Sequence, residues 1–125
     1  MLQLKLLPGT YAVCRLEAGA AVPRWAWGGG LSSVTRTDEE LSIICPEARV
    51  PAGVRSEKGW CCVGIQGPLP FSLTGVLASV VDPLAKAGIS LFAFSTYDTD
   101  YILVKDADLA RARTAWTGAG HDLSP

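Results

Sequence analysis

The feature that most constrains the fold of this chain is a pair of apolar runs, residues 89–94 and 101–104, that flank a polar stretch. Both runs are rich in β-branched and aromatic residues, which favour strands. The stretch between them holds residue types that turns prefer. Its members are Ser95, Thr96, Tyr97, Asp98, Thr99 and Asp100. We therefore predict a β-hairpin over residues 89–104 with several chemically useful side chains at its tip.

The residues around this hairpin predict a complete βαββαβ arrangement. Residues 60–65 form an unbroken apolar run typical of a central strand, and residues 71–88 carry apolar side chains at helical spacing. Ser72 or Thr74 is expected to cap this helix, and Gly88 to end it. A second helix is expected after the hairpin, capped by an aspartate, with a short strand following it.

The first half of the chain predicts two further hairpins. Residues 2–7 and 11–16 are interpreted as one, and residues 31–35 and 40–45 as the other. At an offset of sixty residues the second of these falls on the later hairpin, so that Asp38 coincides with Asp98 and Glu40 with Asp100. We interpret the chain as a degenerate duplication. Its first copy has lost most of its first helix, because the residues after the first hairpin show no sustained helical period.

Composition restricts the classes of partner. The 125 residues are 49% hydrophobic and 18% charged, and so apolar a composition suggests that a second copy covers part of the surface, in a homodimer. A net charge of −1 without a basic run argues against nucleic acid. No apolar run approaches the ~20 residues of a membrane span, and no secretory leader is recognisable. We therefore expect a cytoplasmic protein without membrane contact.

Metal and catalytic sites find little support in the sequence. The four cysteines are Cys14, Cys45, Cys61 and Cys62. They lack the paired spacing of a zinc site, and we expect them to be buried, reduced thiols. No catalytic triad or phosphate-binding glycine loop is recognisable, so no cofactor is expected. An enzyme that uses the acidic cluster of residues 38–40 as a base is an alternative, and a solvated turn is the simpler interpretation.

A polar hairpin tip beside the start of a helix has the chemistry of a small-molecule site. The first turn of a helix carries unpaired N–H groups and the positive end of the helix dipole, which suit a carboxylate. Gly75 would allow a ligand to approach that backbone closely, and Asp100 would balance an ammonium or guanidinium group. Together these features predict an amino acid. The simpler interpretation is that Asp98 and Asp100 stabilise a turn while Thr74 caps the helix.

Four segments resemble one known family. Residues 94–104 (FSTYDTDYILV), preceded by residues 75–78 (GVLA) and 83–90 (PLAKAGIS), resemble the ACT domain. Residues 33–43 (SVTRTDEELSI) are similar to the N-terminal half of small bacterial two-copy ACT proteins. The likeness extends to the regulatory domains of aspartate kinases and to cytosolic arginine sensors.

The resemblance implies an α+β fold of two tandem ferredoxin-like βαββαβ halves, with antiparallel sheets and helices on one face. Residues 1–55 would form a degenerate N-terminal ACT-like half, and residues 60–125 a C-terminal ACT domain. Members of the family are regulatory modules that bind amino acids or other small metabolites between two ACT units. The residues of this chain that match such a ligand site are Thr74, Gly75, Thr96, Tyr97, Asp100, Ser33 and Val34.

We therefore predict a non-catalytic regulatory module that binds an amino acid or a similar small metabolite at an interface between ACT-like units. It would work as a homodimer, and a regulated enzyme would lie on another chain. The alternative is a protein–protein interaction module that has retained no ligand.

Overall fold

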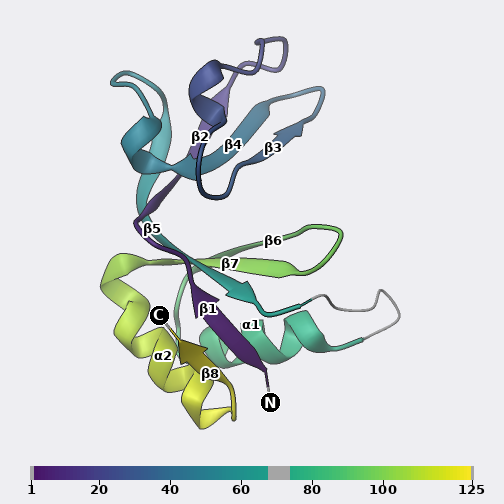
Figure 1. Ribbon diagram of the computed structural model, residues 1–125, viewed down its shortest axis with the longest axis vertical. Coiled ribbons are helices and arrows are strands. Elements are labelled where there is room, and N and C mark those ends of the chain that lie inside the picture. Colours follow the sequence, from purple (N-terminus) through teal and green to yellow (C-terminus); the bar gives the residue numbers. More distant parts are fainter. Residues whose placement is uncertain (1, 68–73, 125) are drawn as a thin grey trace. The chain divides into compact units, whose positions relative to one another are not determined.

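The computed structural model describes residues 2–67 and 74–124 and divides the chain into two compact units (Figure 1). The larger unit comprises Met1–Pro8 and Cys61–Pro125, and the smaller unit comprises Gly9–Trp60. The boundary predicted from the sequence is different, because residues 1–8 were expected to belong to the N-terminal half. In the structure this first segment lies in the larger unit because its strand pairs there.

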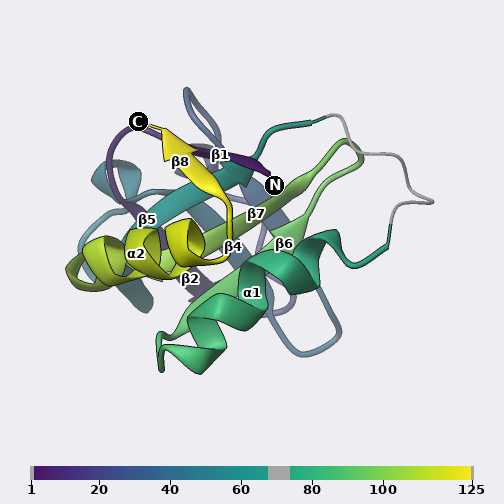
Figure 2. The same cartoon turned by 90° about the horizontal axis from the view of Figure 1, so that it is seen from below.

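The larger unit forms a sheet whose helices lie on one face (Figure 2). Its strands are β1 (Gln3–Leu6), the second part of β5 (Ser56–Ile65), β6 (Leu91–Ser95), β7 (Asp100–Lys105) and β8 (Asp122–Ser124). Their order is β6-β7-β5-β1-β8. The helices are α1 (Val76–Lys86) and α2 (Leu109–Gly118), the latter preceded by the 3₁₀ turn η3 (Asp106–Asp108). The predicted order of strand, helix, strand, strand, helix and strand is confirmed.

The core of this unit lies between the helices and the sheet. Trp116 of α2 is fully buried, and its indole Nε1 donates a hydrogen bond to the backbone oxygen of Val80 in α1 at 2.8 Å. Cys61, Val63 and Ile65 of β5 face the same core at every second residue, as the pleat of a strand requires. Within the described ranges, neither helix has the length and apolar character of a membrane span.

Helix α1 begins later than predicted. Its N-cap is Gly75, whose φ of 77° is a left-handed conformation that glycine adopts without strain. Thr74 is therefore not the cap, and Ser72 lies outside the described residues. Gly88, with a φ of 71°, ends the helix as predicted, and the next amide, that of Ile89, donates to the backbone oxygen of Leu84 at 3.0 Å.

The smaller unit has a four-stranded sheet that repeats the order of β6, β7 and β5 in the larger unit but lacks the inserted strand β1 and the α-helices. Its strands are β2 (Tyr11–Leu16), β3 (Ser33–Arg36), β4 (Leu41–Pro46) and the first residues of β5, in the order β3-β4-β2-β5. The 3₁₀ turns η1 (Arg24–Ala26) and η2 (Glu47–Arg49) stand where a βαββαβ unit has helices. All residues of this unit are described, and none of them lies in an α-helix, whereas the sequence predicted the absence of most of one helix.

The predicted hairpin of residues 2–7 and 11–16 is wrong. Strand β1 pairs with β5 and β8, whereas β2 pairs with β4 and β5. The Pro8-Gly9 pair does turn the chain, but a turn signal indicates only a change of direction. Which strand becomes the neighbour is decided by long-range burial, here that of Leu4 in the core under the helices.

The internal repeat has an offset of 59 residues rather than sixty. In the smaller unit Arg36 pairs with Leu41, and in the larger unit Ser95 pairs with Asp100. Strand β4 with η2 and strand β7 with η3 begin and end at positions 59 apart. Glu40 therefore corresponds to Thr99, and the coincidence of acidic residues expected at sixty is not the structural equivalence.

Arg49 organises the segment that replaces the first helix of the smaller unit. Its Nε donates to the backbone oxygen of Trp25 at 3.1 Å, and its Nη1 donates to that of Gly29 at 2.5 Å. Its Nη2 donates to the backbone oxygen of Ala26 at 3.3 Å and to Ser32 Oγ at 3.1 Å. One guanidinium group therefore satisfies acceptors that a helix would have satisfied with its own amides.

We expect Arg49→Lys to destabilise the protein, because an ammonium group lacks the planar fork that reaches these acceptors together. Acceptors left unsatisfied cost about 1–3 kcal/mol each when buried. These acceptors are part-buried or exposed and an ammonium group still reaches some of them, so we expect a total loss of only about 2 kcal/mol. Urea unfolding followed by tryptophan fluorescence measures it. Arg24→Lys, an exposed change in η1, should have almost no effect, and equal effects of the two variants would contradict this role of Arg49.

His121 joins three separate parts of the larger unit. It is 8% exposed, and its Nδ1 accepts a hydrogen bond from the backbone amide of Leu2 at 3.2 Å. The proton of the neutral ring therefore lies on Nε2, which donates to the backbone oxygen of Ser79 in α1 at 2.9 Å. The ring thus links the residue before β1, helix α1 and the residue before β8.

Replacing His121 with Phe should keep the volume of the ring and remove both hydrogen bonds. The backbone groups of Leu2 and Ser79 would then be left without these partners in a half-buried position, at a cost of about 1–3 kcal/mol. The free energy of unfolding in urea should fall by this amount. Thr117→Ala on the exposed side of α2 is the control. If His121→Phe lowered the free energy of unfolding no more than this control does, the role given to the two His121 hydrogen bonds would be refuted.

Candidate functional site

The hairpin predicted over residues 89–104 is present as β6 and β7, and its tip is closed by threonines. The Thr96 amide donates to the backbone oxygen of Thr99 at 2.8 Å, and Thr96 Oγ1 accepts from the Thr99 amide at 3.4 Å. The hydroxyl of Thr99 donates to the backbone oxygen of Ile65 at 2.6 Å. The tip is therefore fastened to the end of β5 and not left as an independent loop.

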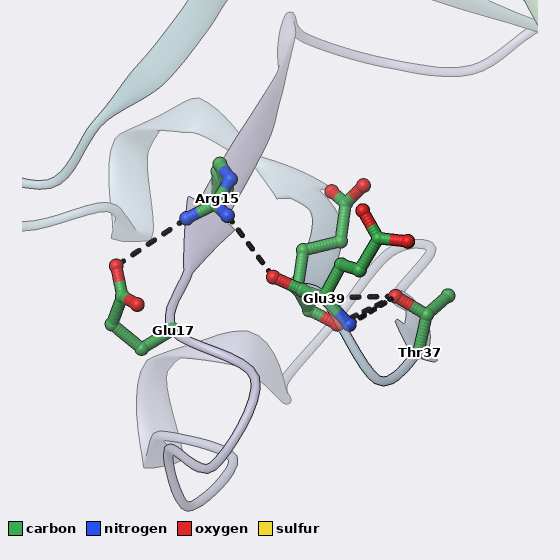
Figure 3. A network of polar contacts seen from close by, with 5 residues as sticks. Arg15, Glu17, Thr37 and Glu39 are labelled. Atoms are coloured by element: carbon green, nitrogen blue, oxygen red, sulfur yellow. Dashed lines mark hydrogen bonds and ion pairs between the residues drawn. The ribbon is translucent and has the colours of Figure 1, made fainter.

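The smaller unit closes its own hairpin in the same way. Thr37 Oγ1 accepts from the amides of Glu39 and Glu40, each at 3.1 Å (Figure 3). Arg15 donates to the backbone oxygen of Glu39 at 3.1 Å, and its ion pair at 3.4 Å is with Glu17. The acidic residues 38–40 thus belong to a threonine-closed turn, and no cluster of metal-ligand residues occurs within the described ranges.

Asp100 lies on the face of the sheet that the helices cover. Ile102, two residues along β7, belongs to the core under the helices, and side chains of a strand alternate between faces. The hydroxyl of Ser95, directly across the hairpin, donates to Asp100 Oδ1. The carboxylate of Asp100 is therefore oriented by a neighbour on the same side of the sheet from which α1 and α2 pack.

The larger unit has a cavity of about 390 Å³ at the open end of β5. Its lining residues are Lys5, Leu7, Gly64, Ile65, Gln66, Gly67, Asp98, Thr99 and Tyr101. They come from β1 and the residue after it, and from the end of β5 and the two residues after it. The others come from the hairpin tip and the start of β7. The cavity thus combines one cation, one carboxylate, one side-chain amide and an aromatic ring.

The absence of a side chain at Gly64 allows the Tyr101 ring to approach the backbone of β5 beside this cavity. Gly64 pairs directly with Lys5 on β1, and a Cβ on Gly64 would lie 3.0 Å from Cε1 of Tyr101. The Tyr101 ring therefore lies against the bare backbone of β5, and Phe94 stacks on its other side with ring centroids 5.5 Å apart. A row of Lys5, Gly64, Tyr101 and Phe94 crosses four strands.

The residues predicted to bind a ligand are distributed over both units. Thr96, Tyr97 and Asp100 lie at or beside the tip of the β6–β7 hairpin, and Tyr97 is 81% exposed. Thr74 and Gly75 lie at the start of α1, and Ser33 and Val34 lie on β3 of the smaller unit. None of the seven lines the cavity, which instead includes two other tip residues, Asp98 and Thr99.

Lys5 and Gln66 were missed as candidate site residues. Gln66 follows an apolar strand, a position where binding residues often occur, and this was the one local signal available. Nothing near Lys5 in the sequence indicates a site. It reaches the cavity only because β1 pairs with a strand some sixty residues away, between Lys5 and Gly64.

The four thiols are buried and free, as predicted. Burial raises the pKa of Cys62 from 9.0 to about 12, with a smaller contribution from neighbouring Cys61. Burial also raises the pKa of Cys61 to about 11, assisted by the Asp106 carboxylate that accepts its hydrogen bond at 3.2 Å. Thiolate nucleophiles need a lowered pKa, so these cysteines do not have the character of catalytic residues.

The raised thiol pKa values predict a loss of stability at high pH. The Cys62 thiol ionises near pH 9 in the unfolded chain and near pH 12 in the folded chain, so stability falls as pH rises through this window. Cys62→Ala removes one such group, so its free energy of unfolding should fall less than that of the parent protein between about pH 9 and 10.5. The difference between the two proteins should grow by at most about 1.4 kcal/mol per pH unit. Urea midpoints measured across this range test it, and parallel curves would contradict it.

Two family models match the chain. Residues 55–115 match the ACT domain, and residues 9–53 match a model described as an N-terminal domain. The first lies almost entirely in the larger unit and the second lies within the smaller unit. The family models thus divide the chain close to the place where the structure divides it.

Similar proteins come from bacteria and animals. The crystal structure of protein Atu0741 from Agobacterium tumefaciens is 46% identical, with a TM-score of 0.94 over 98% of this chain and 92% of that one. Putative protein CASTOR3P of Homo sapiens is 32% identical over 90 residues, and the Bos taurus cytosolic arginine sensor for mTORC1 subunit 1 is 29% identical over 89. Each match covers 62% of this chain, but only 55% and 27% of those relatives.

Proposed function

Because this chain belongs to the ACT domain family, we propose that it is a non-catalytic regulatory module that binds an amino acid or a similar small metabolite at an interface between ACT-like units. A relative that is an arginine sensor supports an amino acid as the class of ligand. The observation that carries the proposal is the carboxylate of Asp100, which Ser95 orients on the helix-covered face of the sheet.

Each proposed residue has a defined role. Asp100 balances the ammonium or guanidinium group of the ligand, while Thr96 and Tyr97 contribute polar contacts from the same hairpin tip. The backbone at Thr74 and Gly75, where α1 begins, offers unpaired amides to the ligand carboxylate. Residues Ser33 and Val34 of β3 supply the opposing side from an ACT-like unit. In this proposal Gly9–Trp60 is the degenerate ACT-like unit.

In this proposal two copies of the chain pair with each other, and they regulate an enzyme on another chain. Strand β6 is an edge strand that pairs only with β7 within the described residues, and its Phe92 is 38% exposed. An apolar edge of this kind is a template for pairing with another chain. A second copy of this protein occupies it, and the enzyme under control lies on a further chain.

A thermal-shift screen against the twenty standard amino acids tests the proposal. An amino acid present at a hundred times its dissociation constant stabilises the fold by about 2.7 kcal/mol, which should raise the midpoint by several degrees. Asp100→Ala should abolish this rise, because the ligand's cationic group would lose its counter-charge. Asp122→Ala, an exposed change on β8, should leave it intact. A flat screen with folded protein would favour the interaction module instead.

A further inference from the structure

We propose that the cavity at the open end of β5 is a second small-molecule site, separate from the one at Asp100, and that it binds a small zwitterion with an amine and a carboxylate. Lys5 contacts the carboxylate and Asp98 contacts the amine. The proposal goes beyond the amino-acid site of the ACT domain, because it uses the other face of the sheet. It also uses a residue, Lys5, that lies outside the matched range 55–115.

The two sites lie on opposite faces of one sheet. Leu4 and Ile102 belong to the core beneath the helices, so their strand neighbours Lys5 and Tyr101 point away from the helices. Asp100 points toward the helix side, as its alternation with Tyr101 requires. A ligand against Tyr101 and Lys5 is therefore separated from Asp100 by the backbone of the sheet.

The charges in the cavity are available to a ligand. The side chains of Lys5 and Asp98 form no ion pair or hydrogen bond with any residue of the described ranges 2–67 and 74–124. By contrast, Lys86 is paired with Asp82 at 2.9 Å, and Arg111 with Asp108 at 3.2 Å. Lys5 and Asp98 thus line one cavity with opposite charges, which is the complement of a zwitterion.

A hydrogen bond, strand pairing and ring stacking hold the walls of the cavity. Thr99 fastens the hairpin tip to the backbone oxygen of Ile65 at 2.6 Å, which fixes the position from which Asp98 projects. Lys5 is held opposite Gly64 by strand pairing. The Tyr101 ring, on which Phe94 stacks, forms an aromatic part of the wall. The volume of about 390 Å³ falls in the range of ligand sites, ~300–1,000 Å³.

A further polar group of the site is the side-chain amide of Gln66, which has no hydrogen-bond partner among the described residues. It stands at the end of β5, where its backbone amide is already used in a bond to the backbone oxygen of Gln3 at 2.9 Å. Its side chain can donate to a carboxylate or accept from an ammonium group. Gln66 therefore complements both charged residues and favours a molecule that carries both groups over a simple acid or a simple amine.

Nuclear magnetic resonance of the full chain locates binding directly. The twenty standard amino acids are titrated one at a time, and the backbone amide signals of Gly64, Gln66 and Gly67 are followed. We expect at least one amino acid to move these signals with saturation. Lys5→Met and Asp98→Asn should each weaken that binding at least about tenfold, because each removes a charge-assisted contact. Lys86→Met and Asp82→Asn, matched changes on α1, should not alter it.

The Asp100→Ala variant separates this site from the one at the hairpin tip. Shifts at Gly64 and Gly67 should persist in this variant with an unchanged dissociation constant. Their loss in Asp100→Ala would show one shared site and overturn the proposal, as would shifts that survive both Lys5→Met and Asp98→Asn. If none of the twenty amino acids moves these signals while one still raises the thermal midpoint, the cavity is not a zwitterion site and the function proposed above stands.

The ligand groups are assigned with analogues of each amino acid that binds. The amide of the amino acid lacks the carboxylate, and the acid without its α-amine lacks the ammonium group. The parent protein should prefer the amino acid to both. Lys5→Met should abolish the preference for the amino acid over its amide. Asp98→Asn should abolish the preference for the amino acid over the deaminated acid. Unchanged preferences in these variants would refute the assigned contacts.

Discussion

The backbone hydrogen bonds of strand β5 are the constraint on which both units depend. Its first residues pair with β2 in the smaller unit, and its last residues pair with β1 in the larger unit, where β7 takes the other side. Residues 60–65 of this strand are all buried, so its side chains there are apolar on both faces. This explains the unbroken apolar run of residues 60–65.

The two units preserve hairpin geometry and differ in their helices. Both hairpins have the same strand register at an offset of 59 residues, and both close with a threonine hydroxyl, that of Thr37 or Thr96. Where helices are lost, Arg49 provides donors to the backbone of the replacing segment. Strand pairing is thus the feature that the two units share, because its hydrogen bonds do not depend on which element covers the sheet.

A single sheet presents different chemistry on its two faces in the larger unit. On the helix side, Asp100 is oriented by Ser95 near the family's expected site. On the other side, the bare backbone of Gly64 accommodates the Tyr101 ring. Lys5, Asp98 and Thr99 line the same cavity as these two residues. The alternation of side chains along β7 assigns successive residues to separate sites.

The sequence alone determined the elements that short-range patterns control. The hairpin over residues 89–104, the two helices and the glycine that ends α1 follow from local periodicity and turn chemistry, and they are as predicted except that α1 begins later. Only the tertiary structure decided the partner of β1, the offset of 59 and the placement of Lys5 and Asp98 around one cavity. These depend on which distant strands pair, and that choice reflects burial summed over the whole core, which no local pattern encodes.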